Sequence, residues 1–224
     1  MSDLVAIFGY GSLVNAATHR TPVVATVSAE LDGWRRVWRR RPPNPDSPRD
    51  GIAFLSVEEA PGTTIQGVLM IDRAASLPDL DRREALYDRV PLDRSALRIL
   101  EDHPALAPDV PCFIYRAAAA AAAGEAPPPR MIRSYLDAVF QGFHARFGEG
   151  AVEAFLASTA DGALEVDEDR ERPIYPRAVR LTQAERAAFD RLLPPRPRPR
   201  AGPEGLHPPR LGTKEPESPR VTGE

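Results

Sequence analysis

The chain has 224 residues, of which 42% are hydrophobic and 27% are charged, and its formal net charge at pH 7 is -3. This length predicts one substantial core, and the small negative charge argues against a general nucleic-acid binder, because such proteins carry an excess of Lys and Arg. The single cysteine, Cys112, excludes an intrachain disulfide and a cysteine-rich zinc site, and no apolar stretch approaches membrane-spanning length. We therefore expect a soluble cytoplasmic protein that binds neither nucleic acid nor membrane.

The first predicted element is a short buried strand, an apolar run from Val5 to Phe8. It leads directly into a loop, Gly9-Tyr10-Gly11-Ser12-Leu13. Two glycines allow positive φ or the close approach of another group at little cost, as a loop requires if its N–H groups are to face a ligand. They are equally compatible with a tight turn in which they only relieve steric clashes. The loop alone does not decide between an anion-binding cradle and an ordinary turn.

Further strands are predicted at residues 23–31, 33–38, 51–57 and 64–71, the last two joined as a hairpin through residues 58–62. The second of them places Trp34 and Trp38 on one face and begins a basic cluster that consists of Arg35, Arg36, Arg39, Arg40 and Arg41. Arginines can hold a carboxylate bidentately, but we interpret this charge run as a solvated face. Strands that come early and helices that come late favour an α+β fold.

A helix is predicted over residues 76–89. Leu77, Leu80, Glu84 and Tyr87 are spaced by three, four and three residues, so they lie along one helix face. The line that should pack inward therefore contains a carboxylate, and a buried charge is costly unless it is paired. Glu84 therefore pairs with Arg83 or another arginine at the rim, becomes protonated, or lines a cavity.

Later segments complete one domain, residues 1–193. A helix from Ile132 onward places aromatic side chains in the core or in a cavity wall, and a closing helix is capped by Thr182 with Glu185. Residues 117–123 are predicted to be a surface insertion. Residues 194–224 are rich in Pro and Arg and are predicted to be a disordered tail. The four histidines are scattered, which gives zinc catalysis little support.

Three segments together resemble the gamma-glutamylcyclotransferase superfamily, including its ChaC-like branch. They are Phe8-Gly9-Tyr10-Gly11-Ser12-Leu13, Gly33-Trp34-Arg35-Arg36-Val37-Trp38 and Leu80-Asp81-Arg82-Arg83-Glu84-Ala85-Leu86-Tyr87, in the same order and at similar separations. Residues 132–137 and 173–177 are also similar to family members, so the resemblance covers residues 4 to 193. It implies an α+β fold with a small mixed, mostly antiparallel β-barrel flanked by helices. It also implies a cavity for a γ-glutamyl group and no requirement for a cofactor or metal.

The activity that this resemblance implies is ring closure of a γ-glutamyl amine or peptide. The α-amine of the substrate attacks its own γ-carbonyl, which releases the amine or peptide and leaves 5-oxoproline. Glu84 takes the role of general acid and base, and Tyr10, Gly11, Ser12 and Leu13 take the role of substrate-binding residues. The alternative is a catalytically silent module on the same fold that binds a small metabolite or recruits a partner. The sequence specifies neither the leaving group nor the oligomeric state.

Overall fold

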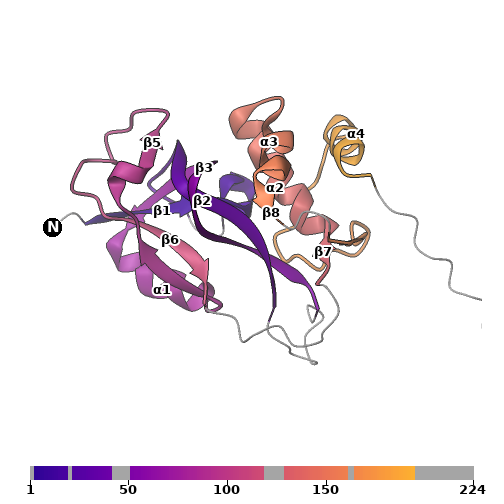
Figure 1. Cartoon of the computed structure of the whole chain (residues 1–224), viewed down its shortest axis with the longest axis horizontal. Coiled ribbons are helices and arrows are strands. Elements are labelled where there is room, and N and C mark those ends of the chain that lie inside the picture. Colours follow the sequence, from indigo (N-terminus) through magenta and orange to yellow (C-terminus); the bar gives the residue numbers. More distant parts are fainter. Residues whose placement is uncertain (1–2, 20–21, 42–50, 119–128, 161–163, 195–224) are drawn as a thin grey trace, which may run out of the picture.

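The computed structural model describes residues 3–19, 22–41, 51–118, 129–160 and 164–194. Within these residues the main element is a seven-stranded mixed sheet with the order β4-β6-β1-β3-β2-β5, in which β8 pairs with β2 (Figure 1). Its strands are β1 (Leu4–Gly9), β2 (Ala25–Arg40), β3 (Ala53–Arg73), β4 (Tyr87–Pro91), β5 (Leu97–Ile99), β6 (Cys112–Ala117) and β8 (Thr159–Ala160). The β1–β6 and β2–β8 pairs are parallel and the other pairs are antiparallel. β7 (Met131–Ile132) and β9 (Val166–Asp167) form a separate parallel pair.

The sheet is open, which corrects the predicted closed barrel. Closure would require the two outermost strands, β4 and β5, to pair with each other. Within the described residues β4 pairs only with β6, and the three-residue β5 pairs only with Ala29–Leu31 of β2. The α+β class and the mostly antiparallel sheet flanked by helices are confirmed.

The two longest strands also correct the predicted hairpin. Residues 51–57 and 64–71 do not pair with each other, because both belong largely to β3, which pairs along its length with β2. Trp34 pairs with Glu59 and Asp32 pairs with Thr64, so the register shifts at this point. The intervening residues of β3 form a bulge in which Gly62 has a φ of 84°. The turn-forming residues therefore bend a strand and do not end it.

Helices cover both faces of the sheet, as Figure 1 shows for α1 on one side and α2–α4 on the other. Side chains alternate along β1: Ala6 and Phe8 pack in the main core with residues of α2–α4, whereas Ile7 packs with Leu80 of α1. The α-helices are α1 (Leu77–Arg83), α2 (Arg133–Phe147), α3 (Ala151–Ala157) and α4 (Gln183–Leu192). The 3₁₀ helices are η1 (Ser12–Val14), η2 (Ala16–Thr18), η3 (Ala74–Ser76) and η4 (Arg94–Ala96).

Several local predictions can be compared directly with the structure. The capping box of Thr182 and Glu185 is confirmed at the start of α4, and Cys112 lies buried in β6. Residues 119–128, with most of the predicted insertion, and residues 195–224, with nearly all of the predicted tail, lie outside the described residues. None of the helices in the described ranges has the length and apolar character needed to cross a bilayer.

Candidate active site

A cavity of about 550 Å³ lies where the β1–η1 loop, the turn after α1 and the start of α2 meet. It brings together all five residues that the sequence analysis singled out: Tyr10, Gly11, Ser12, Leu13 and Glu84. The rest of the lining is largely aromatic and apolar, with two arginines, and consists of Phe8, Gly9, Arg41, Ile52, Ala53, Phe54, Leu55, Ala85, Leu86, Tyr87, Tyr115, Ile132, Tyr135, Tyr175, Pro176 and Arg177. Glu84 thus opens into the cavity that the loop lines.

The glycines of the loop allow neighbouring atoms to approach the backbone closely, and neither glycine has a positive φ angle. Gly11 has a φ of -136°. A Cβ atom on Gly11 would lie 2.8 Å from the hydroxyl oxygen of Tyr135 and 3.0 Å from Leu55. A Cβ on Gly9 would lie 2.8 Å from the Cβ of Leu13. The loop is therefore folded back on itself and packed tightly against α2 and β3, with no room for a larger residue at either glycine.

The residues after the loop are fixed to α2. The side-chain amide of Asn15 donates to the carbonyl oxygen of Ala138 (2.9 Å) and to Gln141 (3.1 Å). Gly142 allows this contact, because a Cβ there would lie 2.7 Å from the backbone nitrogen of Asn15. The hydroxyl of Thr18 donates to the carbonyl oxygen of Ser12 at 2.7 Å. These bonds hold the loop in one position relative to α2.

Arg36 supports the loop from the side of β2. Its side chain is buried, and its Nε donates to the carbonyl oxygen of Tyr10 at 2.8 Å. Its two terminal nitrogens donate to the hydroxyl of Ser158 (2.9 Å) and to the carbonyl oxygen of Gln66. One guanidinium group therefore links Tyr10 of the loop to β3 and to the end of α3.

The buried position of Arg36 shows that the predicted solvated face was wrong for this residue. Its guanidinium carbon lies 5.0 Å from the ring centroid of Phe143 and 4.8 Å from that of Phe155. Burial lowers the pKa of Arg36 to about 9, so the group stays charged at neutral pH. Arg35, on the opposite face of the strand, is exposed and paired with Glu58, as a solvated face requires.

Glu84 reaches the cavity in a different way from the one predicted. α1 ends at Arg83, and Glu84 is its C-cap residue with φ -97° and ψ 36°. The N–H of Glu84 donates to the carbonyl oxygen of Leu80 (2.9 Å), and its own carbonyl oxygen accepts from the N–H of Tyr87 (2.8 Å). Tyr87 begins β4, so the predicted helix over 76–89 is too long, and the continuous helical line through Leu80, Glu84 and Tyr87 is wrong. A tight turn, held by main-chain bonds, presents the carboxylate.

Tyrosines form much of the cavity wall, and their hydroxyl groups are held in place. The hydroxyl of Tyr10 donates to the carbonyl oxygen of Tyr115 (2.7 Å), and that of Tyr87 donates to the carbonyl oxygen of Leu55 (2.8 Å). The hydroxyl of Tyr115 donates to the Asp81 carboxylate at 2.7 Å. These bonds tie the β1–η1 loop to β6, β4 to β3, and β6 to α1, around the turn that carries the acidic residue.

Four tyrosines share the electrostatic field of one carboxylate. Burial raises the pKa values of Tyr10, Tyr87, Tyr115 and Tyr135, and the negative charge of Glu84 contributes to the rise at each of them. These four of the five cavity tyrosines therefore remain neutral hydroxyl groups at neutral pH. The site combines one carboxylate with neutral hydroxyls and backbone N–H groups, which suits proton transfer on a polar substrate.

Sequence reasoning did not identify the arginines of the cavity as site residues. Arg41 belongs to the basic cluster that was interpreted as solvated, and Arg177 lies in a segment noted only for its family resemblance. Tyr135 was expected in the core or a cavity wall, and it does line the cavity. The sequence feature that could have identified Arg177 as a site residue was its position near Tyr175 in the segment 173–177, which resembles family members. In the described ranges, no group of three or more His, Cys, Asp and Glu side chains is placed to hold a metal ion.

Comparison with known proteins gives likeness in structure only. No model of a known protein family matches the chain, and no curated protein sequence matches it. A solved gamma-glutamyl cyclotransferase is similar over 84% of this chain and 99% of its own, with a TM-score of 0.51 and 12% sequence identity. An uncharacterised human protein is similar over the same shares of the two chains, with a TM-score of 0.50 and 15% identity. The chain therefore has the fold of gamma-glutamyl cyclotransferases.

Proposed function

We propose that this protein is a cyclotransferase that acts on γ-glutamyl amines or peptides and needs no cofactor. The α-amine of the substrate forms a bond to its own γ-carbonyl carbon, and the bond from that carbon to the leaving nitrogen breaks. The products are 5-oxoproline and the free amine or peptide, and no water is consumed. The observation that carries the proposal is that Glu84 and the loop from Tyr10 to Leu13 line one cavity.

Glu84 is proposed to move the proton that the reaction requires. An ammonium group is not nucleophilic, so the α-amine must lose a proton before it attacks, and the leaving nitrogen must gain one before it departs. A single carboxylate beside both nitrogens can accept the first proton and donate it to the second. The turn after α1 holds Glu84 by main-chain hydrogen bonds, so the carboxylate keeps its position between the two transfers.

The loop is proposed to bind the γ-carbonyl and to stabilise the negative charge that develops on its oxygen. Backbone N–H groups serve this purpose when they are fixed in advance and directed at the oxygen. No backbone hydrogen bond in the described part of the chain uses the N–H of Gly11 or Leu13. Support from Arg36 and Asn15 keeps this loop rigid. Tyr10 and Ser12 are proposed to shape the cavity so that the γ-glutamyl chain folds into a near-attack conformation.

The fold supports this assignment, and the residues of the cavity specify it. The solved structure named gamma-glutamyl cyclotransferase shares the fold at 12% identity, and one fold can carry different sites. Residues 1–193 are the proposed catalytic unit, because both parts of the site and all the elements that support them lie there.

The test is product formation with purified protein and a matched pair of variants. The protein is incubated with γ-glutamyl dipeptides, glutathione and γ-glutamyl-lysine derivatives, and 5-oxoproline is measured by mass spectrometry. We expect turnover of at least one compound and a loss of about 100-fold or more in Glu84→Gln. Glu149→Gln, which changes an exposed glutamate in the turn between α2 and α3, should retain full activity. Absence of 5-oxoproline with every compound, or full turnover by Glu84→Gln, would remove this mechanism.

A further inference from the structure

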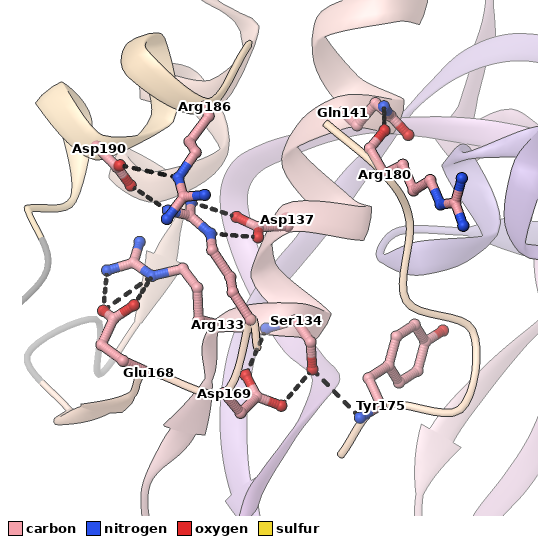
Figure 2. Close-up of polar contacts among 11 residues, drawn as sticks. Arg133, Ser134, Asp137, Gln141, Glu168, Asp169, Tyr175, Arg180, Arg186 and Asp190 are labelled. Atoms are coloured by element: carbon pink, nitrogen blue, oxygen red, sulfur yellow. Dashed lines mark hydrogen bonds and ion pairs between the residues drawn. The ribbon is translucent and has the colours of Figure 1, made fainter. Parts of the chain in front are cut away.

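Part of the cavity wall is formed by Tyr175, Pro176 and Arg177, and a buried carboxylate clamps the segment that carries them, residues 168–177, to the start of α2 (Figure 2). The Asp169 carboxylate accepts from the backbone N–H of Ser134 (2.7 Å), from its hydroxyl (2.5 Å) and from the N–H of Ile174 (2.8 Å). The hydroxyl oxygen of Ser134 in turn accepts from the N–H of Tyr175 (3.2 Å). The main chain is therefore fixed immediately before the residues that face the cavity.

Ion pairs hold the same segment to two helices. The Arg133 side chain, which is fully buried, donates to the Glu168 carboxylate at 2.7 to 3.2 Å. Arg170 binds both carboxylate oxygens of Asp137 on α2 (2.7 and 2.8 Å) and also binds Asp190 on α4 (2.7 Å). Residues 168–177 follow β9 and contain no helix or strand, but this segment is rigid because its side chains anchor it to the helices.

This rigid segment presents Tyr175, Pro176 and Arg177 to the cavity. The guanidinium carbon of Arg177 lies 5.4 Å from the ring centroid of Tyr175, so the ring supports one side of the cation. Burial raises the pKa of Tyr135, and the positive charge of Arg177 acts against that rise, which places this charge close to the α2 wall.

Two polar groups in this wall have no hydrogen-bond or ion-pair partner within the part of the chain that the structure describes. Arg177 makes no ion pair or hydrogen bond there, although three other arginines on or beside α2, Arg133, Arg146 and Arg170, bind carboxylates. The hydroxyl oxygen of Tyr175 is buried and has no hydrogen-bond partner, and the residue as a whole is only 9% exposed. A buried donor without an acceptor is unfavourable. Both groups are available to an oxyanion in the cavity.

We propose that Arg177 binds a carboxylate of the ligand, with the hydroxyl of Tyr175 as a second donor to it. A guanidinium group offers parallel N–H donors that match the two oxygens of a carboxylate. That this carboxylate belongs to a γ-glutamyl compound rests on the proposed function. The proposal that Arg177 binds a carboxylate is independent of the proposed function. In the cyclisation itself Arg177 takes no part in bond making or proton transfer, and it sets affinity and specificity.

The first measurement is independent of turnover. Glutarate, a dicarboxylate that cannot cyclise to 5-oxoproline, is titrated into the wild-type protein and into variants by calorimetry. We expect binding by the wild type and a loss of affinity of about tenfold or more in Arg177→Gln. Tyr175→Phe should lose a smaller factor, and Arg177→Lys should retain part of the affinity because it keeps the charge but loses the fork of donors. Arg172→Gln is the matched control, since Arg172 lies exposed in the same segment.

The second measurement is the steady-state rate with γ-glutamyl-alanine. Arg177→Gln should raise KM by about tenfold or more and leave kcat within a few fold, whereas Arg172→Gln should change neither. If no γ-glutamyl compound is turned over but glutarate binds in a manner that depends on Arg177, the proposed function fails and the carboxylate site stands. If turnover is found but Arg177→Gln leaves both KM and glutarate affinity unchanged, the site is wrong and the function stands. Failure of the wild type to bind glutarate also overturns the site.

Discussion

Replacement of Arg36 by alanine should destabilise the protein far more than replacement of Arg35, its neighbour in β2. Successive side chains of a strand point to opposite faces. Arg36 is buried with three hydrogen bonds and two aromatic rings around it, whereas the Arg35 side chain is 51% exposed and pairs with Glu58. The two variants therefore remove the same side chain from opposite faces of one strand.

The magnitude follows from the groups that lose a partner. Loss of the guanidinium leaves the carbonyl oxygens of Tyr10 and Gln66 without this donor, at about 1–3 kcal/mol each, and removes a desolvated cation–π contact of about 2 kcal/mol. The hydroxyl of Ser158 keeps its bond to Ala154, so it adds little. Relief of the desolvation of a buried charge offsets several kcal/mol. A net loss of about 3 kcal/mol is expected for Arg36→Ala, and less than about 1 kcal/mol for Arg35→Ala.

Equilibrium unfolding in urea, monitored by tryptophan fluorescence, measures both variants against the wild type. Because Arg36 bonds to Tyr10 of the loop, the folded fraction of Arg36→Ala should also bind glutarate and γ-glutamyl substrates more weakly. Equal midpoints for the two variants would refute the reasoning, since they would mean that the buried hydrogen bonds of Arg36 contribute no more than an exposed ion pair.

Three further perturbations test other parts of the site. Gly11→Ala should lower stability and activity, because its Cβ would lie 2.8 Å from the hydroxyl oxygen of Tyr135. Adding Tyr135→Phe removes that hydroxyl and should restore part of the lost stability in the double variant. If the stability losses of the two single variants simply add, the contact is contradicted. Arg170→Ala should lower the free energy of unfolding by about 3–5 kcal/mol, because it leaves Asp137 buried without its partner, and a loss under about 1 kcal/mol in urea melts would disprove it. Tyr10, Tyr87, Tyr115 and Tyr135 have raised pKa values in the folded protein. Their contribution to folding stability is therefore complete below about pH 10, where unfolded tyrosine stays neutral, and is lost as pH rises further. Urea midpoints should fall between about pH 9 and about pH 11, and tyrosinate absorbance should rise only with unfolding; ionisation of these tyrosines in the folded protein would contradict the assignment.

Features encoded by adjacent residues were predictable from the sequence. The apolar run from Val5 to Phe8 specifies a strand buried on both faces, and the glycines that follow allow the next residues to pack closely as a loop. The capping box of Thr182 and Glu185 fixed the start of α4 for the same reason, because both partners lie within one helical turn.

Features that depend on distant pairing were not predictable in this way. The helical spacing through Glu84 continues to Tyr87, but the chain leaves the helix at Arg83 because Tyr87–Pro91 pairs with β6. Likewise Pro61 and Gly62 suggest a turn, yet β3 continues because β2 pairs with it on both sides of the bulge. In both places long-range strand pairing overrides a local signal.

The burial of Arg36 was predictable from the strand periodicity, but the arginine cluster was interpreted from its charge alone. Trp34 and Trp38 were assigned to one face, and a residue midway between them in a strand must lie on that face. The periodicity therefore already placed Arg36 inward, and the interpretation as a solvated charge run overrode it. Burial of an arginine requires several acceptors, and these come from residues 10, 66 and 158, which no local pattern connects.

The central claim is that the α-amine of the substrate, and not water, attacks the γ-carbonyl with Glu84 as the proton carrier. It is tested most directly by turnover in water enriched in oxygen-18, with the products identified by mass spectrometry. We predict 5-oxoproline and free amine, no heavy oxygen in either product, and loss of this reaction in Glu84→Gln but not in Glu149→Gln. Release of glutamate that carries heavy oxygen would show hydrolysis and would contradict the account.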